Sequence, residues 1–362
     1  MKVLQIIDSL ATGGAEKLIL DSLPLYRKAG IKMDVLVLKD NHYPFMKALK
    51  DKDCCKVYVL GSGSVYNLLH IFKIAKILPK YDLAHVHLFP AQYWVVLAKF
   101  WSKAKTKLIF TEHNTSNKRV EYKLLSKLDR VFYKKYDRII AISQEIQNIF
   151  LIHTRLPKDK FDLILNGVNI SNFLNASENN KLFLGFTQDD FLIIQVSAFR
   201  LQKDQPTLIK SLKHLPDHFK LLMVGDGVLR QDCAHLVKQL KLNNRVHFLG
   251  NRSDVPSLLK TADVVVLSSY YEGMSLSSIE GMASGKPFVA SDVPGLRNMV
   301  KDAGILFKQG DEKALAEIIK ELAENKFYYN NTVKNCIMRA QKFEISKMVK
   351  NYIGLYKDVL EK

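Results

Sequence analysis

The stretch 271–287 holds the densest set of side chains that could bind a ligand. It follows the apolar run Val264–Leu267, which is typical of a buried strand, and we expect a helix to begin near Ser275. The first turn of a helix has unpaired backbone N–H groups and a positive dipole end. The serines at 275, 277 and 278 add hydroxyl donors, so this turn is suited to a phosphate group.

Two glutamates belong to the same stretch. Glu272 precedes the expected helix, and Glu280 lies about a turn and a half inside it. This separation does not suit an acid and a base that flank one bond. It suits two carboxylates that each accept paired hydroxyl hydrogens, one pair from a sugar and one from a ribose. The alternative is that Glu272 only faces the helix dipole and Glu280 is a solvated helix residue.

The elements that must position these residues follow the pattern of parallel α/β domains, in which short β-branched runs alternate with amphipathic segments. In the first half, the expected strands are Val3–Asp8, Asp34–Leu38, Lys56–Leu60, Leu83–His87, Lys107–Thr111, Arg138–Ile142 and Phe161–Leu165. The expected helices between them include Ala15–Lys28, Asn67–Leu78, Tyr93–Ser102, Lys118–Tyr136 and Gln144–Phe150.

The same pattern restarts after a polar stretch, Ser171–Asn180. The expected strands of the second half are Leu192–Ser197, Lys220–Val224, Val246–Leu249, Val264–Leu267, Phe288–Ala290 and Ile305–Phe307. We therefore predict an α/β protein of two Rossmann-like, doubly wound domains, 1–170 and 171–345, that face each other across a cleft. The segment 346–362 is expected to form a last helix, because apolar side chains recur at helical spacing from Met348 to Val359.

The string Glu-Gly-x-x-Leu-x-x-x-Glu-x-Met-Ala-x-Gly-x-Pro, which begins at Glu272, resembles the signature of retaining GT-B-fold glycosyltransferases of the group 1 type, family 4. Further landmarks occur in the same order as in that family and extend the resemblance over nearly the whole chain. They are Gly13–Glu16, Thr111–Asn114, Asn166–Asn169, Lys203–Leu208, Val224–Gly227 and Phe248–Val255.

The resemblance implies a role for each matching residue. Glu280 would bind the ribose hydroxyls, Glu272 the hydroxyls of the donor sugar, and Lys203 the diphosphate. The amides of Met274, Ser275 and Leu276 would receive the phosphates or the sugar.

The remaining matches would surround the transferred sugar and the base. Gly14 and His113 would close over the sugar from the first domain, and Asn251 and Arg252 would lie by the base, Arg252 through its backbone. The last helix would cross back to the first domain.

A cation at the diphosphate has a physical reason, since negative charge builds on the leaving phosphate oxygen as the glycosidic bond breaks. Lys203 occupies the family's position for this cation. Arg200 could be a second one, because its planar fork suits phosphate. It stands three residues before Lys203, whereas family members carry an arginine about five before, and Ala198 fills that place. A surface salt bridge is the alternative role for Arg200.

His113 is expected at the carboxyl end of a strand, as a binding residue and not a general base, while His85 and His87 are expected to be structural. The resemblance implies a same-face reaction assisted by the leaving phosphate, without a nucleophilic carboxylate. We recognise no metal-binding Asp-x-Asp motif. No cofactor is expected beyond the nucleotide-sugar substrate, for which UDP is the expected nucleotide.

Two expected helices of the first domain combine apolar and basic residues. Trp94 and Trp101 lie seven positions apart on one of them, and Lys123 and Lys127 belong to the other. Such helices can lie in the headgroup region of a membrane. The alternative is that the apolar faces pack on the sheet. The cation surplus favours a lipid-linked acceptor and an anionic membrane surface, with an oligosaccharide as the other acceptor class.

Composition gives the remaining expectations. The net charge is +18, and residues 1–180 hold 28 lysines and arginines against 16 acids, while residues 181–362 hold 26 against 20. A basic half indicates an anionic partner. The apolar runs are too short for a membrane span or a signal peptide. Four cysteines without metal-site spacing indicate free thiols. We expect a cytoplasmic protein that can associate with the inner face of the plasma membrane.

Two other functions remain as alternatives. A non-hydrolysing sugar-nucleotide epimerase would share the architecture but would need no acceptor. A nucleic-acid-binding protein is suggested by charge alone, and the sequence lacks a recognition-helix motif, a zinc finger or an aromatic single-strand platform. We therefore expect no nucleic-acid partner.

Overall fold

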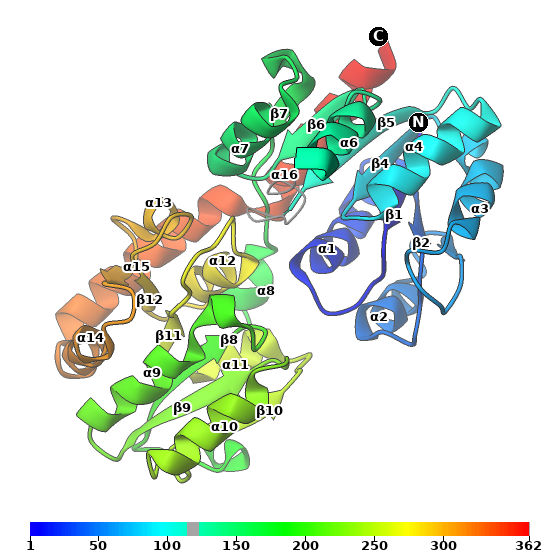
Figure 1. Ribbon diagram of the computed structural model, residues 1–362. Helices are drawn as coiled ribbons and strands as arrows, with labels where there is room; N and C mark the ends of the chain where they lie inside the picture. The colour runs from blue at the N-terminus through cyan, green and yellow to red at the C-terminus, as the bar shows by residue number, and fades with distance from the viewer. Residues whose placement is uncertain (114–122, 362) are drawn as a thin grey trace. The chain divides into compact units, whose positions relative to one another are not determined.

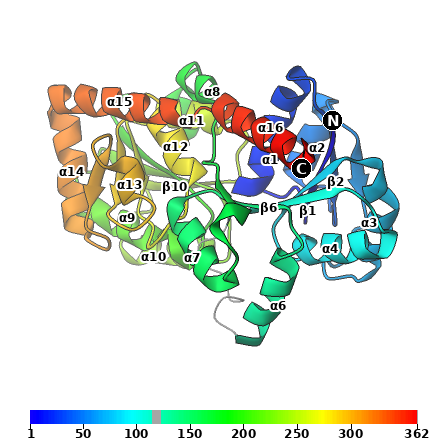
Figure 2. The same ribbon diagram turned by 90° about the horizontal axis from the view of Figure 1, so that it is seen from above.

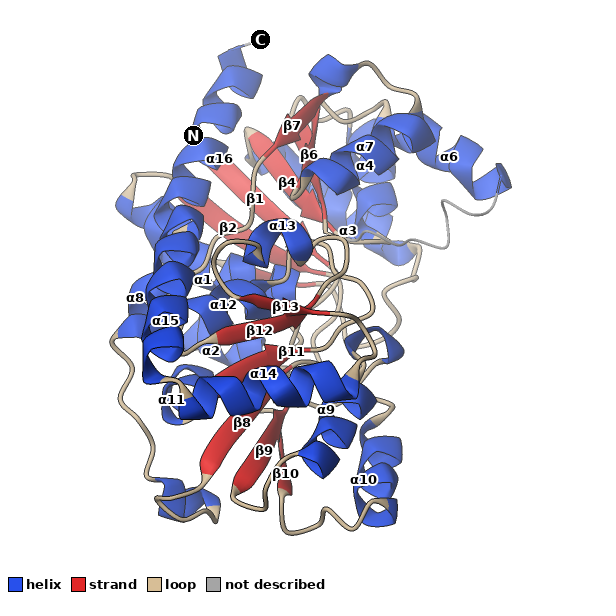
Figure 3. Ribbon diagram, turned by 90° about the vertical axis from the view of Figure 1, so that its left-hand side faces the viewer, coloured by secondary structure: helices blue, strands red, loops and turns tan. Residues whose placement is uncertain are grey.

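A computed structural model of the chain describes residues 1–113 and 123–361, which divide into two compact units. Unit 1 comprises Met1–Gly167 with Ile345–Lys362, and unit 2 comprises Val168–Glu344. Each unit is a parallel sheet with helices on both faces (Figures 1 and 3). The prediction of two doubly wound α/β domains is therefore confirmed for each unit by itself.

The sheet of unit 1 has seven strands in the order β3-β2-β1-β4-β5-β6-β7, and every neighbouring pair is parallel. All seven strands lie where the sequence predicts them, within two residues at each end. Their bounds are β1 Lys2–Ile7, β2 Lys32–Val37, β3 Val57–Val59, β4 Leu83–His87, β5 Lys107–Glu112, β6 Arg138–Ala141 and β7 Phe161–Leu163.

Two groups of helices cover the faces of this sheet (Figure 2). On one face lie α1 (Gly14–Lys28), α2 (Pro44–Lys52) and α16 (Ile345–Glu361). On the other lie α3 (Leu69–Ile77), α4 (Ala91–Ser102), α6 (Lys123–Tyr133) and α7 (Gln144–Thr154), with the short 3-10 helices η1 (Leu78–Lys80) and η2 (Lys158–Lys160) between elements. The first residues of the predicted helix Lys118–Tyr136 fall outside the described residues.

The C-terminal helix α16 returns to unit 1, as the resemblance implies, and a polar cluster explains its position. Gln5 and His85 are register partners on β1 and β4, and both are buried. The Tyr356 hydroxyl of α16 lies 2.8 Å from His85 Nδ1 and 3.4 Å from Gln5 Nε2. One turn earlier, the Tyr352 hydroxyl lies 3.2 Å from Thr111 Oγ1. Buried polar groups need such partners, so the hydroxyls of α16 fit this sheet face.

The sheet of unit 2 has six parallel strands in the order β10-β9-β8-β11-β12-β13. The sequence predicts all six of them. Their bounds are β8 Phe191–Val196, β9 Phe219–Val224, β10 Val246–Gly250, β11 Val264–Leu267, β12 Phe288–Ser291 and β13 Ile305–Phe307.

Helices of unit 2 also form two layers (Figure 3). On one side lie α9 (Gln205–Ser211), α10 (Arg230–Gln239) and α14 (Glu312–Glu324), and on the other α8 (Ile170–Leu174), α11 (Val255–Thr261), α12 (Leu276–Ala283) and α15 (Lys326–Ala340), with α13 (Arg297–Val300) after β12. The 3-10 helices are η3 (Lys181–Leu184), η4 (Leu201–Lys203), η5 (Leu212–His214) and η6 (Gln341–Phe343). Strands covered on both faces are buried throughout, which explains the uninterrupted apolar run of β11.

Among the described residues, no helix is both long enough and apolar enough to span a bilayer. All four cysteines are free thiols.

Candidate active site

Lys203 is held at the end of β8 by its backbone. It closes the 3-10 helix η4, and Asp204, in the left-handed region with φ 42°, connects η4 to α9. The Lys203 carbonyl accepts hydrogen bonds from Gln195 Nε2 and from Ser268 Oγ, both at 3.2 Å. Since Gln195 and Ser268 belong to the adjacent strands β8 and β11 or their ends, the position of Lys203 is fixed by the sheet.

The side chain of Lys203 forms an ion pair with Glu272. Lys203 Nζ lies 2.5 Å from Glu272 Oε1, and Ser269 Oγ donates to the same oxygen at 2.6 Å. The side chain of Glu272 is 5% exposed and that of Lys203 15%. The structure therefore brings two of the predicted site residues into direct contact. Ser269, which the sequence interpretation missed, is the second residue after the end of β11 and could have been recognised from that position.

Two hydrogen bonds to Gln202 hold the loop that carries Glu272. Tyr270 N donates to the Gln202 carbonyl at 2.8 Å, and Gln202 Nε2 donates to the Tyr271 carbonyl at 3.0 Å. On the other side lies Gly295, whose φ is +84°. A Cβ atom there would lie 2.1 Å from the Glu272 carbonyl oxygen, so only glycine allows this close approach of the two loops.

The predicted helix after this loop is α12, which begins at Leu276 with Ser275 as its N-cap, so the expected start near Ser275 is confirmed. Glu280 lies inside the helix and is 4% exposed, which does not fit a solvated helix residue. The side chain of Met274, just before the first turn of the helix, is also buried and is 7% exposed. Ser278 Oγ donates to the Ser275 carbonyl at 2.7 Å.

The other predicted donor residues are exposed. Arg200 is exposed, and among the described residues no carboxylate lies within ion-pair distance of its guanidinium. Asn251 and Arg252 follow the edge strand β10, and the Arg252 guanidinium binds Asp254 through two nitrogens at 2.7 and 2.8 Å. Gly14 is the first residue of α1 and is exposed.

His113 lies at the carboxyl end of β5, next to a hydrogen-bonded chain. Its Nε2 is 3.0 Å from His87 Nδ1, and His87 Nε2 is 2.7 Å from Gln5 Oε1. Because the Gln5 oxygen can only accept, His87 Nε2 carries the proton and His87 Nδ1 accepts from His113 Nε2. Burial lowers the pKa of His113 to about 4. A neutral His113 therefore has an unprotonated Nδ1, which can accept a hydrogen bond from a hydroxyl group.

Burial also lowers the pKa of His85 and of His87 well below the usual value. Both histidines are thus neutral and fully hydrogen-bonded inside unit 1, His85 to Tyr356 and to Thr111 Oγ1 at 2.6 Å. This arrangement agrees with the structural role that the sequence suggests for them.

The residues expected to face an acceptor or a membrane are divided between two helices. On α4, the Trp94 indole N–H donates to the Val65 carbonyl at 2.9 Å and the side chain is half-buried, whereas Trp101 is 67% exposed. On α6, Lys127 is exposed, and the side chain of Lys123 lies outside the described part of the chain.

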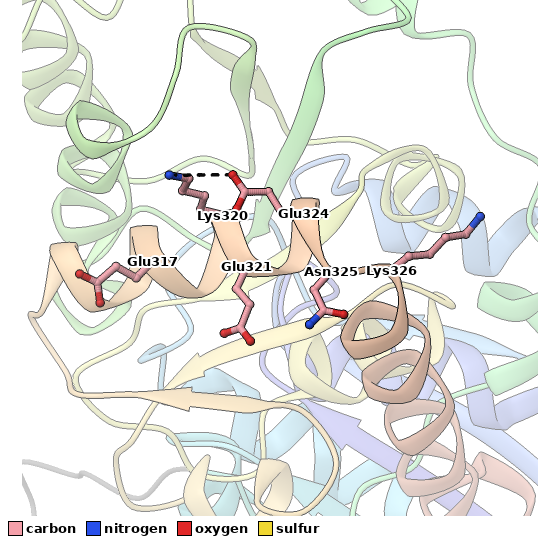
Figure 4. A pocket seen from close by; sticks show the side chains of 6 residues that line it. All are labelled: Glu317, Lys320, Glu321, Glu324, Asn325 and Lys326. Carbon is pink, nitrogen blue, oxygen red and sulfur yellow. Dashed lines mark ion pairs between the residues drawn. The ribbon is translucent and has the colours of Figure 1, made fainter.

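Three surface hollows among the described residues are not lined by Lys203 or Glu272. One of them, about 550 Å³, lies where α14 meets α15, and Figure 4 shows that its side chains point in different directions. It is lined by Glu317, Lys320, Glu321, Glu324, Asn325 and Lys326. A smaller hollow of about 230 Å³ is lined in part by Arg200, Asp204 and Tyr270. Among the described residues, no group of three or more His, Cys, Asp or Glu side chains is arranged to hold a metal ion.

Comparison with known proteins agrees with the geometry. Residues 12–172 match the family model "Glycosyltransferase Family 4", and residues 177–343 match "Glycosyl transferases group 1". The chain is 27% identical over 313 residues to the Escherichia coli UDP-Gal:alpha-D-GlcNAc-diphosphoundecaprenol alpha-1,3-galactosyltransferase, covering 81% of this chain and 79% of that protein. It is 27% identical over 246 residues to the Campylobacter jejuni N,N'-diacetylbacillosaminyl-diphospho-undecaprenol alpha-1,3-N-acetylgalactosaminyltransferase, covering 66% and 65%.

Among solved structures, Anabaena HepE in complex with UDP and glucose is similar over 99% of this chain and 100% of that one, with a TM-score of 0.86 and 23% identity. This likeness shows the GT-B fold. The two family models together span nearly the whole chain, which is therefore a glycosyltransferase. It belongs to glycosyltransferase family 4, the group 1 transferases, which retain the anomeric configuration of the transferred sugar.

Proposed function

We propose that this enzyme transfers a sugar from a UDP-sugar to a lipid-linked diphosphate acceptor in the synthesis of a surface glycan. The proposal is supported by the E. coli and C. jejuni relatives, whose names give diphosphoundecaprenol acceptors, and by HepE, which was solved with UDP. The observation that carries the donor half is the Lys203–Glu272 pair beside the start of α12.

In this proposal, Lys203 and Glu272 are held in place before the donor binds, Lys203 for the diphosphate and Glu272 for the sugar. Without a donor, Glu272 holds the ammonium group of Lys203 in place, with the help of Ser269. When a UDP-sugar binds, Lys203 exchanges the carboxylate for the diphosphate, and Glu272 becomes available to the sugar hydroxyls. Because a buried carboxylate without a partner is costly, the exchange favours a ligand that supplies both an anion and hydroxyl groups.

The remaining donor contacts follow the family pattern. Glu280 binds the ribose hydroxyls, and the amides of residues 274–276 receive the phosphate at the positive end of the α12 dipole. Arg252 reaches the base through its backbone, since its guanidinium is occupied by Asp254, and Asn251 lies beside it. The exposed guanidinium of Arg200 is free to bind the diphosphate.

Gly14 and His113 contribute from unit 1. At neutral pH, His113 accepts a hydroxyl hydrogen of the sugar at Nδ1 and does not act as a general base, because its low pKa makes it a weak base. Gly14 has no side chain, so the sugar can approach the backbone at the start of α1.

The reaction consistent with retention keeps both partners on one face of the sugar. The bond from C1 to the β-phosphate oxygen breaks, the acceptor oxygen bonds to C1 from the same side, and the acceptor proton passes to the departing phosphate. Lys203 stabilises the charge that develops on that phosphate, which is where a fixed cation lowers the barrier. No metal or further cofactor has a step in this proposal.

A lipid-linked acceptor would place the enzyme at a membrane surface, for which we propose the cytoplasmic side. This half of the proposal rests on the relatives' names and on the cation surplus of the first half of the chain. A soluble oligosaccharide is the competing acceptor.

A transfer assay tests the proposal. The full chain is incubated with UDP-glucose, UDP-galactose or their N-acetyl forms, and with either GlcNAc-diphospho-polyprenol or a soluble oligosaccharide. We expect UDP release that depends on the lipid-linked acceptor, an α-linked product, and loss of both with Glu272→Gln. Epimerisation of a UDP-sugar without acceptor, or transfer only to the soluble oligosaccharide, would contradict it.

A further inference from the structure

Unit 1 exposes a group of large apolar side chains on and beside α3 and α4. Phe100 is 84% exposed and Trp101 67%, although the helix that carries them packs against α3 and the sheet. The loop before α3 and its first turns add Tyr66 (60%), Leu68 (62%), Leu69 (58%) and Phe72 (43%). Proteins that work alone in water rarely gather so many large apolar groups in one exposed patch.

The two helices form one surface, here called the α3–α4 face. They lie side by side in Figure 2 and are in contact along their length. The Phe72 and Trp101 rings meet edge to face with centroids 5.1 Å apart. At the other end, the Trp94 indole N–H holds the Val65 carbonyl, next to the exposed ring of Tyr66. The apolar side chains are therefore held on an ordered surface.

The segment that carries these side chains is almost entirely basic, and Lys107 at its end forms an ion pair with Asp137 at 3.6 Å. Neither α3 nor α4 contains an acidic residue, and between residues 61 and 107 the chain has a single acid, Asp82, which accepts from the Lys2 backbone N–H. The same segment holds seven lysines: Lys73, Lys76, Lys80, Lys99, Lys103, Lys105 and Lys107. Among the described residues, Lys103 and Lys105, which stand two and four positions after Trp101, form no ion pair.

Exposed aromatic side chains beside Lys103 and Lys105 match the chemistry of a bilayer surface. Aromatic rings are favourable at the headgroup level, and cations are attracted to anionic lipids. An apolar protein partner would not require a surface free of acids, and a second copy of this chain would bring two lysine-rich surfaces together. Charge complementarity thus favours an anionic lipid surface.

We propose that the α3–α4 face binds the surface of anionic bilayers, with Phe100 and Trp101 at headgroup depth and Lys103 and Lys105 beside lipid phosphates. The biological purpose of this binding rests on the proposed function, because an enzyme bound to the membrane surface encounters a lipid-linked acceptor by diffusion along that surface. The binding itself needs neither donor nor acceptor.

Vesicle flotation of the full chain tests the proposal, with vesicles of phosphatidylcholine alone or with phosphatidylglycerol at a 7:3 ratio. We expect binding to the anionic vesicles that weakens with salt, and at least tenfold weaker binding to neutral ones. Lys103→Glu with Lys105→Glu should weaken anionic binding by roughly 25-fold, since each lysine near the surface contributes about fivefold.

The aromatic side chains have a matched control. Phe100→Ser with Trp101→Ser should reduce binding at least tenfold, whereas Phe327→Ser on α15, where the ring is also 84% exposed, should leave it unchanged. In a Trp94→Phe chain, Trp101 is the single tryptophan, and its fluorescence should shift to the blue on anionic vesicles. Circular dichroism and thermal midpoints verify that each variant is folded.

Three results would overturn the proposal: equal binding to neutral and anionic vesicles, wild-type binding by both double variants, or a dimer in sedimentation velocity that the Phe100→Ser, Trp101→Ser variant abolishes. The last result would assign the face to self-association. Vesicles without acceptor separate this proposal from the proposed function. Failure of lipid-linked transfer with intact flotation would contradict only the acceptor assignment.

Discussion

Gly295 offers a stringent test of the donor site, because its substitution acts on the Glu272 loop through the backbone. A Cβ at position 295 would lie 2.1 Å from the Glu272 carbonyl oxygen and 2.6 Å from that of Gly273. An ordinary carbon–oxygen contact needs more than 3 Å, so in Gly295→Ala one loop must move by about 1 Å. That distance is enough to cost on the order of 100-fold in a reaction that depends on positioning.

Gly310 provides the matched control. It has nearly the same positive φ, +78° against +84°, but an added Cβ would meet nothing within 4 Å. Both alanine variants should lose about 1–2 kcal/mol of stability from the left-handed backbone. Only Gly295→Ala should also lose donor affinity and kcat/KM, by at least tenfold.

The assays are calorimetric titration with UDP, transfer kinetics, and denaturant unfolding, all on the full chain. If Gly295→Ala binds UDP and turns over as Gly310→Ala does, the Glu272 loop does not carry the donor, and the reasoning fails. If both variants lose donor affinity equally, the effect is general instability and not the clash.

Three further predictions concern the same residues. Lys203→Met and Glu272→Gln should each weaken UDP-sugar binding at least tenfold. A double-mutant cycle should show that the two substitutions are coupled, since the two side chains lie 2.5 Å apart. Additive effects on the binding free energy would contradict an interaction between Lys203 and Glu272. The free energy of unfolding should fall as pH drops below about 6.5, by up to about 1.4 kcal/mol per pH unit for each of His85, His87 and His113. The reason is that burial lowers the pKa of these side chains in the folded chain, so the unfolded chain binds protons that the folded chain does not. A free energy of unfolding that stays constant down to pH 5 would contradict their burial. Tyr356→Phe should destabilise unit 1 by about 1–3 kcal/mol, by leaving His85 Nδ1 without its hydrogen-bond partner. A ¹⁵N spectrum should show a changed His85 signal, and an unchanged one would contradict the hydrogen bond.

The order and bounds of the strands could be predicted because each is a short apolar run followed by an amphipathic helix. The helix α2 was not predicted, since it buries only Met46 and Leu49 and presents little periodicity. The sequence also pointed to α12 correctly, because the serine N-cap and the strand before it are local signals.

Contacts between residues that are distant in the chain could not be predicted from the sequence. The Lys203–Glu272 ion pair joins residues on two different strand ends, and nothing in the spacing gives the 2.5 Å contact. The hydrogen-bonded chain from His113 to Gln5 depends on the register of β1, β4 and β5. Likewise, sequence periodicity treats Trp94 and Trp101 alike, whereas packing against Val65 covers one and leaves the other exposed.

The proposed donor site requires that unit 2 binds both the ribose and the diphosphate. Calorimetric titration of UDP into the wild-type chain and into Glu280→Gln measures this. We predict a single site per chain in the wild type and at least tenfold weaker affinity in a folded Glu280→Gln variant. Absence of UDP binding by the wild type, or equal affinity in the variant, would contradict the assignment of this site.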